Sequence, residues 1–242
     1  LLMVPGELLN DLLLSYLLLG IGSLVLWILL ALGAQRIAGE TGASRGVGRT
    51  LLHVGIFSGA VPAQLWLGFW GVCLYGTVIT ACVFLSHRRG GRALLSRILV
   101  REGEEGPKAN QLLVPMVATA AGGLSAALMV GSFAAVGYLV CGWGDGSGEV
   151  AGRLMGRRHY RAPLSRASGS VKTLEGSIAV LVSGFLGGWA ALGLLGFPPH
   201  QAAGAGLAAG LAGALVEGLS GGRTDNFLVQ LVPSLSAWWI LG

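Results

Sequence analysis

The chain has 242 residues, of which 53% are hydrophobic and 42 are glycine, and its mean hydropathy is +0.72. Only 11% of the residues are charged, against about 25% in soluble domains. This composition excludes a soluble globular domain, a disordered chain and a disulfide-stapled secreted module. A net charge of +5 would suggest a nucleic-acid partner in a soluble protein. In a membrane protein, topology explains such a charge, and we expect no nucleic-acid partner here.

Five long segments without Asp, Glu, Lys or Arg follow one another along the chain: 12–35, 50–87, 109–144, 176–216 and 226–242. One helical crossing needs about 20 apolar residues. The three central segments therefore each predict a hairpin of two helices, and the two outer segments predict one helix each. Because a backbone inside lipid must satisfy its own hydrogen bonds, the spans should be helices. The sequence predicts an all-α fold, a polytopic membrane bundle of about eight transmembrane helices (seven to nine) in a single domain over 1–242.

The positive charges all fall on one side of this arrangement. The connecting segments on that side contain all 16 Lys and Arg residues: 36–49, 87–108, 145–175 and 217–225. The positive-inside rule makes this side cytoplasmic and places both chain termini on the non-cytoplasmic side. We expect a multi-pass protein of a bacterial inner membrane, with a plastid or the endoplasmic reticulum as alternatives. Glycine-rich helix faces permit a homodimer.

The first candidate site is the glycine-rich run at 144–156. Its glycines, Gly144 and Gly146 among them, predict a loop that wraps an anion and leads into a helix N-terminus, where phosphate binds readily. Asp145 and Glu149 are four residues apart and share a face if the helix begins at Asp145. Two carboxylates beside phosphates suit Mg²⁺. A polar cap at the end of a span explains the same residues equally well.

Three further positions follow along the chain. Lys172 is one of only two lysines and could hold a transferring phosphate, although a lysine snorkelling from a helix end is the ordinary alternative. Glu217 directly follows an apolar run, where a carboxylate is costly and often functional. Asp225 and Asn226 precede the last span, and a helix cap is their ordinary explanation.

Three segments together carry a resemblance to one family: GDGSGEVAGRLMG at 144–156, VKTLEGS at 171–177 and TDNFLVQLVP at 224–233. They are similar to motifs of the polyprenol, dolichol and phytol kinase family. RTLLHVG at 49–55 resembles that family's early Arg-Lys-x-x-His motif, retaining Arg49 and His53 but with Thr50 at the lysine position. The resemblance covers 45–242 and leaves the first span and loop, 1–44, uncovered.

The resemblance implies a kinase that uses CTP, or alternatively ATP, to phosphorylate a membrane-embedded lipid alcohol such as phytol, a farnesol-type alcohol, a polyprenol or dolichol. It implies roles for the following residues: catalysis by Asp145, Lys172, Glu217 and Asp225; Mg²⁺ binding by Asp145, Glu149 and Asp225; nucleotide binding by Gly144, Gly146, Ser147, Gly152, Arg153, Thr173, Glu175 and Asn226; and substrate binding by Arg49 and His53.

Two other function classes remain as alternatives. The related phosphatidate cytidylyltransferases share the Gly-Asp and Lys-Thr-x-Glu-Gly elements, but here no lysine follows Lys172 and no His-Gly-Gly occurs. A small-molecule transporter needs polar residues near the membrane midplane. The long uncharged segments contain few of these, mainly Gln64 and scattered Ser and Thr, so we favour the kinase.

Overall fold

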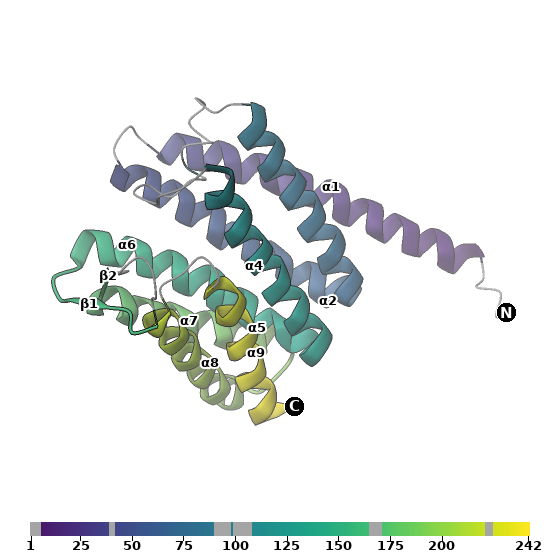
Figure 1. Cartoon of the computed structure of the whole chain (residues 1–242). Helices are drawn as coiled ribbons and strands as arrows, with labels where there is room; N and C mark the ends of the chain where they lie inside the picture. The colour runs from purple at the N-terminus through teal and green to yellow at the C-terminus, as the bar shows by residue number, and fades with distance from the viewer. Residues whose placement is uncertain (1–5, 39–41, 90–97, 99–107, 165–170, 221–224) are drawn as a thin grey trace.

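The computed structural model describes residues 6–38, 42–89, 98, 108–164, 171–220 and 225–242 (Figure 1). This part of the chain is almost entirely helical, which confirms the all-α prediction. Some of the arginines counted above lie outside the described residues: Arg92, Arg97, Arg101, Arg166 and Arg223.

The elements follow in this order: α1 (Gly6–Ile37), α2 (Gly42–Arg89), α4 (Lys108–Val130), the 3₁₀ turn η1 (Gly131–Phe133), α5 (Ala134–Leu139), the π-helical segment η2 (Val140–Asp145), α6 (Gly146–Met155), β1 (His159–Arg161), β2 (Val171–Thr173), α7 (Leu174–Leu194), α8 (Pro199–Leu219) and α9 (Asp225–Leu241). The short antiparallel hairpin β1–β2 was not predicted. It pairs Tyr160 with Lys172.

Five helical segments of the described chain are long and apolar enough to cross a membrane: Asn10–Ile37, Gly46–Ser86, Leu113–Met155, Leu174–Leu194 and Pro199–Leu219. This is fewer than the eight crossings predicted. The second and third segments have 41 and 43 residues, about twice the length that a single crossing requires. The last helix, α9, has 17 residues.

Each of the two longest segments is interrupted by a glycine with a left-handed backbone. Gly68 has φ 59° and divides α2, and Gly131 has φ 58° and begins η1 between α4 and α5. Residues with a Cβ rarely adopt this conformation, so glycine permits the sharp change of direction. The chain reverses at each of these glycines. The second half of α2 turns back towards the side from which the first half came, and α5–α6 turns back in the same way after α4 (Figure 1).

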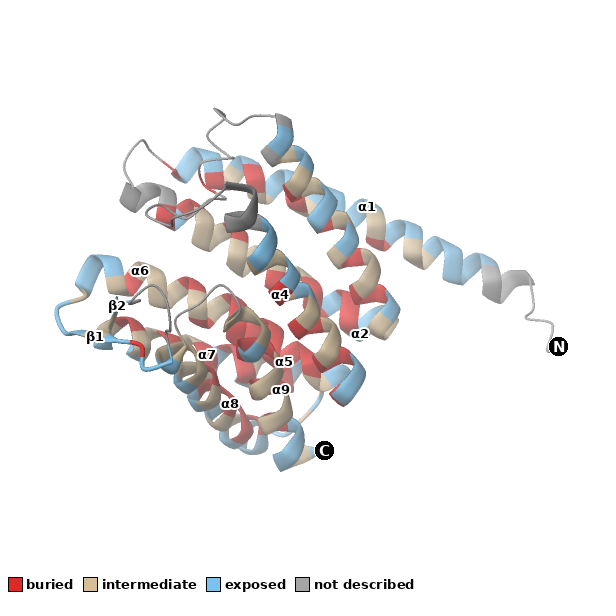
Figure 2. Ribbon diagram, viewed as in Figure 1, coloured by how far each residue is buried: buried red, intermediate tan, exposed pale blue. Residues whose placement is uncertain are grey.

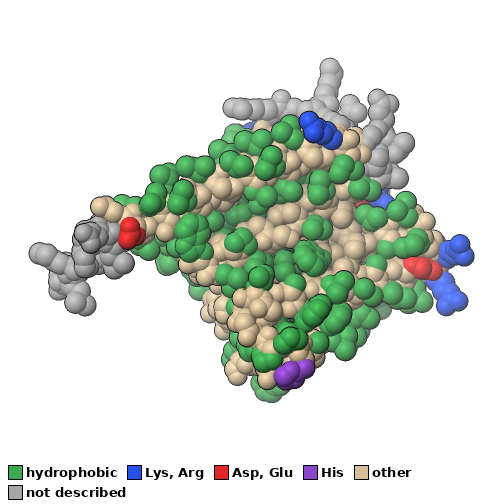
Figure 3. Space-filling model, turned by 180° about the vertical axis from the view of Figure 1, so that it is seen from behind, with side chains coloured by type: hydrophobic (Ala, Val, Ile, Leu, Met, Phe, Trp, Pro, Cys, Tyr) green, Lys and Arg blue, Asp and Glu red, His purple; other side chains and the backbone are tan. Residues whose placement is uncertain are grey.

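The core is centred on α5. All six of its residues are buried, and the surrounding segments of α2, α4, α7 and α9 pack around it (Figure 2). The outside of the bundle is apolar. Along α1, for example, Leu13, Leu17 and Leu29 are each about 60% exposed. Lys and Arg side chains lie towards one margin of the molecule, and hydrophobic side chains cover much of the remaining surface in the view of Figure 3. This distribution is compatible with an integral membrane protein.

Glycines bring α7 and α8 into near backbone contact. A Cβ added to Gly188 would lie 3.2 Å from the Cα of Gly206, and one added to Gly184 would lie 3.4 Å from the Cα of Gly210. Small residues at such positions allow close helix approach in membranes. Much of the unusual glycine content therefore serves helix packing.

We predict that two Gly→Ala substitutions in α8 have opposite effects on stability. At Gly210 an added Cβ would lie 2.6 Å from the backbone nitrogen of Phe185, whereas at Gly204 it meets nothing within 4 Å. Gly210→Ala should therefore destabilise the protein by about 1–3 kcal/mol through overpacking. Gly204→Ala should be neutral or stabilising by up to about 1 kcal/mol because alanine favours the helix. Thermal unfolding of the purified protein in detergent measures both, and equal effects would contradict the proposed contact.

Candidate functional site

The glycine-rich run at 144–156 is helical rather than an open loop, so the predicted phosphate-wrapping loop is wrong. η2 continues directly into α6, and Asp145 itself has helical backbone angles, so this point offers no free helix N-terminus. The glycines contact neighbouring elements: Gly144 faces Val180 of α7, Gly146 faces Thr50 of α2, and Gly152 faces Thr173. Their lack of side chains allows α6 to fit between α2 and α7.

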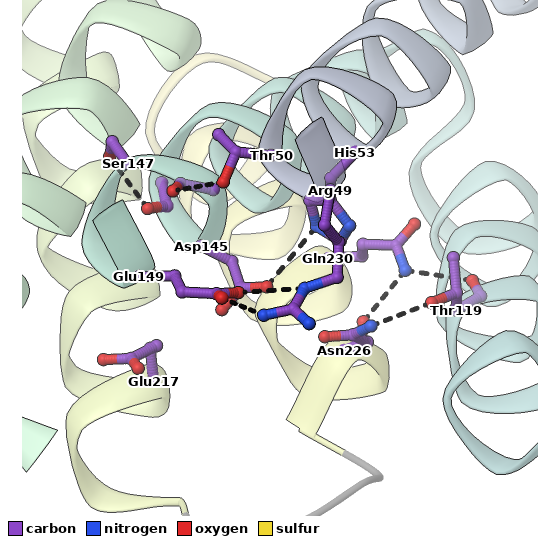
Figure 4. Close-up of polar contacts among 12 residues, drawn as sticks. Arg49, Thr50, His53, Thr119, Asp145, Ser147, Glu149, Glu217, Asn226 and Gln230 are labelled. Carbon is purple, nitrogen blue, oxygen red and sulfur yellow. Dashed lines mark hydrogen bonds and ion pairs between the residues drawn. The ribbon is translucent and has the colours of Figure 1, made fainter. Parts of the chain in front are cut away.

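Asp145 and Glu149 share one face of this helix, as expected, and both point towards α2 (Figure 4). There they meet Arg49 and His53, which are one turn apart. The Arg49 guanidinium forms an ion pair with Glu149, with Nε donating to Oε2 at 3.2 Å. His53 Nε2 lies 3.5 Å from Asp145 Oδ2. Residues about 100 positions apart in the sequence therefore form one charged cluster.

Glu149 also binds a second arginine. Arg153, one turn further along α6, lies 2.9 Å from Glu149 Oε1 through its terminal nitrogen. The side chain of Glu149 is only 14% exposed, while that of Arg153 is 36% exposed. The carboxylate is thus enclosed between Arg49 and Arg153.

Ser147 points away from this cluster. Its hydroxyl lies within hydrogen-bonding distance of the backbone oxygens of Gly144, at 2.9 Å, and Ala179, at 3.2 Å, and it also contacts the hydroxyl of Ser183 on α7. The structure therefore places the predicted nucleotide ligand Ser147 in the contact between α6 and α7.

Lys172 and Glu217 form an ion pair between the hairpin and the end of α8. The Lys172 ammonium donates to both the carboxylate and the backbone oxygen of Glu217, and the two side chains are 14% and 15% exposed. The hairpin is further held by the hydroxyl contact between Tyr160 and Ser177, at 2.7 Å. Two predicted functional residues from separate segments are thus direct partners.

Thr173 and Glu175 organise the start of α7. Thr173 is its N-cap, and its hydroxyl accepts a hydrogen bond from the backbone N–H of Gly176 at 3.2 Å. The carboxylate of Glu175 accepts the backbone N–H groups of Arg157 and Arg158 at 3.2 and 3.3 Å. These two predicted nucleotide ligands therefore tie the hairpin to α7.

The start of α9 is fixed by contacts of Asn226, a predicted nucleotide ligand, and of Thr119 and Gln230, which were not predicted. Asn226 Nδ2 donates to Thr119 Oγ1 of α4 at 3.0 Å. Gln230 Nε2 donates to the backbone oxygens of Thr119 and Asn226, both at 2.9 Å. Gln230 is 1% exposed. An amide isolated within an apolar helix was the one available signal for Gln230, and Thr119 had none.

The cluster combines four carboxylates with three cations: Asp145, Glu149, Glu217 and Asp225 with Arg49, Arg153 and Lys172. Asp145 and Asp225 both lie within electrostatic range of Glu217. Among the described side chains, no group of three or more His, Cys, Asp or Glu is arranged to hold a metal ion. Mg²⁺, however, usually takes only one or two protein carboxylates, with water and substrate phosphates completing its shell.

Asp145 and Asp225 each carry the hard oxygen donors that such a site uses. Glu149, the third predicted ligand, is directed to Arg49 and Arg153 instead.

Comparisons of the chain with protein-family models, with curated proteins and with solved structures find no match.

We predict that the Lys172–Glu217 pair behaves as a coupled unit. Lys172→Met or Glu217→Gln alone leaves the other charged group without its partner in a mostly buried site. Breaking a buried ion pair in this way typically lowers the free energy of unfolding by about 3–5 kcal/mol. The double variant should lose less than the sum of the two single losses. Thermal unfolding in detergent measures all three variants.

The control is Arg161→Met, because Arg161 is exposed on the same hairpin, and its effect should stay within about 0.5 kcal/mol. Additive single losses would show that the two side chains do not depend on each other.

Proposed function

We propose that the protein is a membrane-embedded kinase that transfers the γ-phosphoryl group of CTP, or alternatively ATP, to the hydroxyl of an isoprenoid or other lipid alcohol. One observation carries the proposal. The motif residues that resemble the lipid-alcohol kinases come from α2, η2, α6, β2, α8 and α9, yet their charged side chains gather at one end of the bundle. Membrane topology explains cations at this end, but it does not require the carboxylates that gather with them.

The charges suit phosphoryl transfer, which depends mainly on positioning and on neutralising charge. Arg49, Arg153 and Lys172 supply positive charge for the phosphates. All three are paired with carboxylates, so a nucleotide would compete with Glu149 and Glu217 for them.

Asp145 and Asp225 would hold Mg²⁺, which when bound neutralises phosphate charge. In the transfer, a new bond forms between the lipid oxygen and the γ-phosphorus as the bond to the β-phosphate oxygen breaks. A carboxylate of the cluster orients the lipid hydroxyl and accepts its proton. The apolar tail stays within the bilayer, because the lipid-facing surface of the bundle is hydrophobic.

We further propose eight crossings, with α2 contributing two, the α4–α6 segment two, and α1, α7, α8 and α9 one each. Tryptophans support this arrangement. Trp66 and Trp70, which flank the break at Gly68, are 53% and 67% exposed, and Trp239 near the end of α9 is 84% exposed. All three lie a helix length away from the charged cluster, where a second membrane interface would attract tryptophan. The charged end would then be cytoplasmic and the termini would lie outside.

Cysteine accessibility tests this topology. In a variant lacking the three native cysteines, His200→Cys lies in the first turn of α8, opposite the charged end, and Arg157→Cys lies at that end. A membrane-impermeant maleimide added to intact cells should label position 200, while position 157 should react only after the membrane is opened. The reverse pattern would overturn the proposed orientation.

The competing enzyme is a cytidylyltransferase that makes a CDP-lipid. The two reactions differ in their products, because a kinase releases CDP and a cytidylyltransferase releases pyrophosphate. Purified protein supplied with CTP labelled at the α- or the γ-phosphate, and with a panel of lipid alcohols or phosphatidate, separates the two. The kinase predicts γ-label in the lipid, and α-label in the lipid would support the alternative.

We predict that Asp145→Asn lowers lipid phosphorylation by at least about 10²-fold while the protein remains folded, because the substitution removes a carboxylate proposed to bind Mg²⁺. Asp11→Asn is the matched control, since Asp11 is exposed at the start of α1, far along the chain from the cluster. Thermal unfolding confirms folding of both variants. Near wild-type turnover by Asp145→Asn would remove Asp145 from the mechanism.

A further inference from the structure

The Thr119 hydroxyl accepts a hydrogen bond from the amide nitrogen of Asn226, which leaves the amide oxygen for the charged cluster. The amide nitrogen Nδ2 is directed to Thr119 Oγ1 at 3.0 Å. In Figure 4 the amide oxygen points the other way, to the side on which Asp145, Glu149 and Glu217 lie. The two ends of an amide differ chemically, since the nitrogen only donates hydrogen bonds and the oxygen accepts them or binds cations.

This orientation is held in place by the contact between α4 and α9. A Cβ added to Gly122 would lie 2.7 Å from the Cα of Phe227, so the two backbones touch next to Asn226. Gln230 links the backbones by donating to the oxygens of both Thr119 and Asn226. Thr119 and Asn226 therefore keep a fixed separation, at which the threonine hydroxyl accepts the amide N–H of Asn226.

The end of the amide that faces the cluster determines which ligand it can bind. An amide oxygen is a hard ligand of the kind that Mg²⁺ and Mn²⁺ accept beside carboxylates, whereas an amide N–H₂ group would serve a phosphate oxygen. With the nitrogen engaged by Thr119, Asn226 presents its oxygen on the side of Asp145, Glu149 and Glu217.

We propose that Thr119 is a positioning residue that turns the Asn226 amide oxygen towards a divalent cation, making Asn226 a cation ligand rather than a phosphate donor. The inference rests on the proposed function for the identity of the site. Neighbours that orient metal ligands typically change metal affinity by about 10–100-fold when they are removed.

Binding of Mn²⁺ to the full-length protein in detergent, followed by electron paramagnetic resonance, tests this directly and does not depend on turnover. Thr119→Val should weaken Mn²⁺ binding by about 10–100-fold, and Thr119→Ser should restore it because serine keeps the hydroxyl. Thr77→Val is the matched control. The Thr77 hydroxyl bonds within its own helix to the backbone oxygen of Cys73, and the residue is exposed on α2.

A second comparison isolates orientation from stability. Asn226→Asp makes both ends of the side chain oxygen, so its orientation towards Thr119 no longer decides what faces the cation. In that background Thr119→Val should change Mn²⁺ affinity by less than about threefold, which is small against the 10–100-fold expected in the native background. A loss of equal size in both backgrounds would show that Thr119 acts through the fold and would overturn the proposal.

The remaining outcomes separate this inference from the proposed function. Unchanged Mn²⁺ affinity in Thr119→Val, or an equal loss in Thr77→Val, overturns the role of Thr119 even if the wild-type protein phosphorylates lipid alcohols. Failure of the wild-type protein to bind Mn²⁺ also overturns it, and lipid phosphorylation measured on the same sample then decides the kinase separately. Mn²⁺ binding with the expected pattern but without phosphorylation would support Thr119 and reject the kinase.

Discussion

The ion pair between Arg49 and Glu149 is the interaction on which the charged end of the protein depends. It joins α2 to α6, and Arg153 approaches the same carboxylate from the next turn of α6. Removing ionised groups from water is costly unless an opposite charge compensates them. In a bundle whose surface is mainly apolar, this cost draws charged residues from separate helices together. The Lys172–Glu217 pair likewise compensates two partly buried charges and joins the hairpin to α8.

Close helix packing sets the distances between the charged side chains at this end of the bundle. Gly146 lets α6 approach α2 at Thr50, and Gly144 and Gly152 let it approach α7 and the hairpin. Gly122 does the same for α4 and α9. Larger residues at these positions would separate the helices and move Asp145 away from its neighbours. The glycines therefore contribute to the site through packing, even though they do not form the loop that their spacing suggests.

The charged residues of the site were easier to predict from the sequence than its uncharged polar residues. Charge is rare in this chain, so each acid outside the apolar segments is conspicuous, and Asp145, Glu217 and Asp225 stand out for that reason. Thr119 resembles other polar residues of membrane helices, and Gln230 is marked only as an isolated amide in an apolar helix. The conformation of 144–156 was also misjudged, because glycine permits a loop and a tightly packed helix equally, and only the neighbouring helices select one of them.

By itself, the sequence determined the helical class, the apolar spans and the short set of acids and bases available for chemistry. These follow from composition and from the spacing of charges, which act locally along the chain. Only the tertiary structure decided that Arg49 meets Glu149, that Lys172 meets Glu217, and that Asn226 turns its nitrogen to Thr119. Those contacts join residues 45 to 107 positions apart, and their geometry depends on how closely the intervening helices pack.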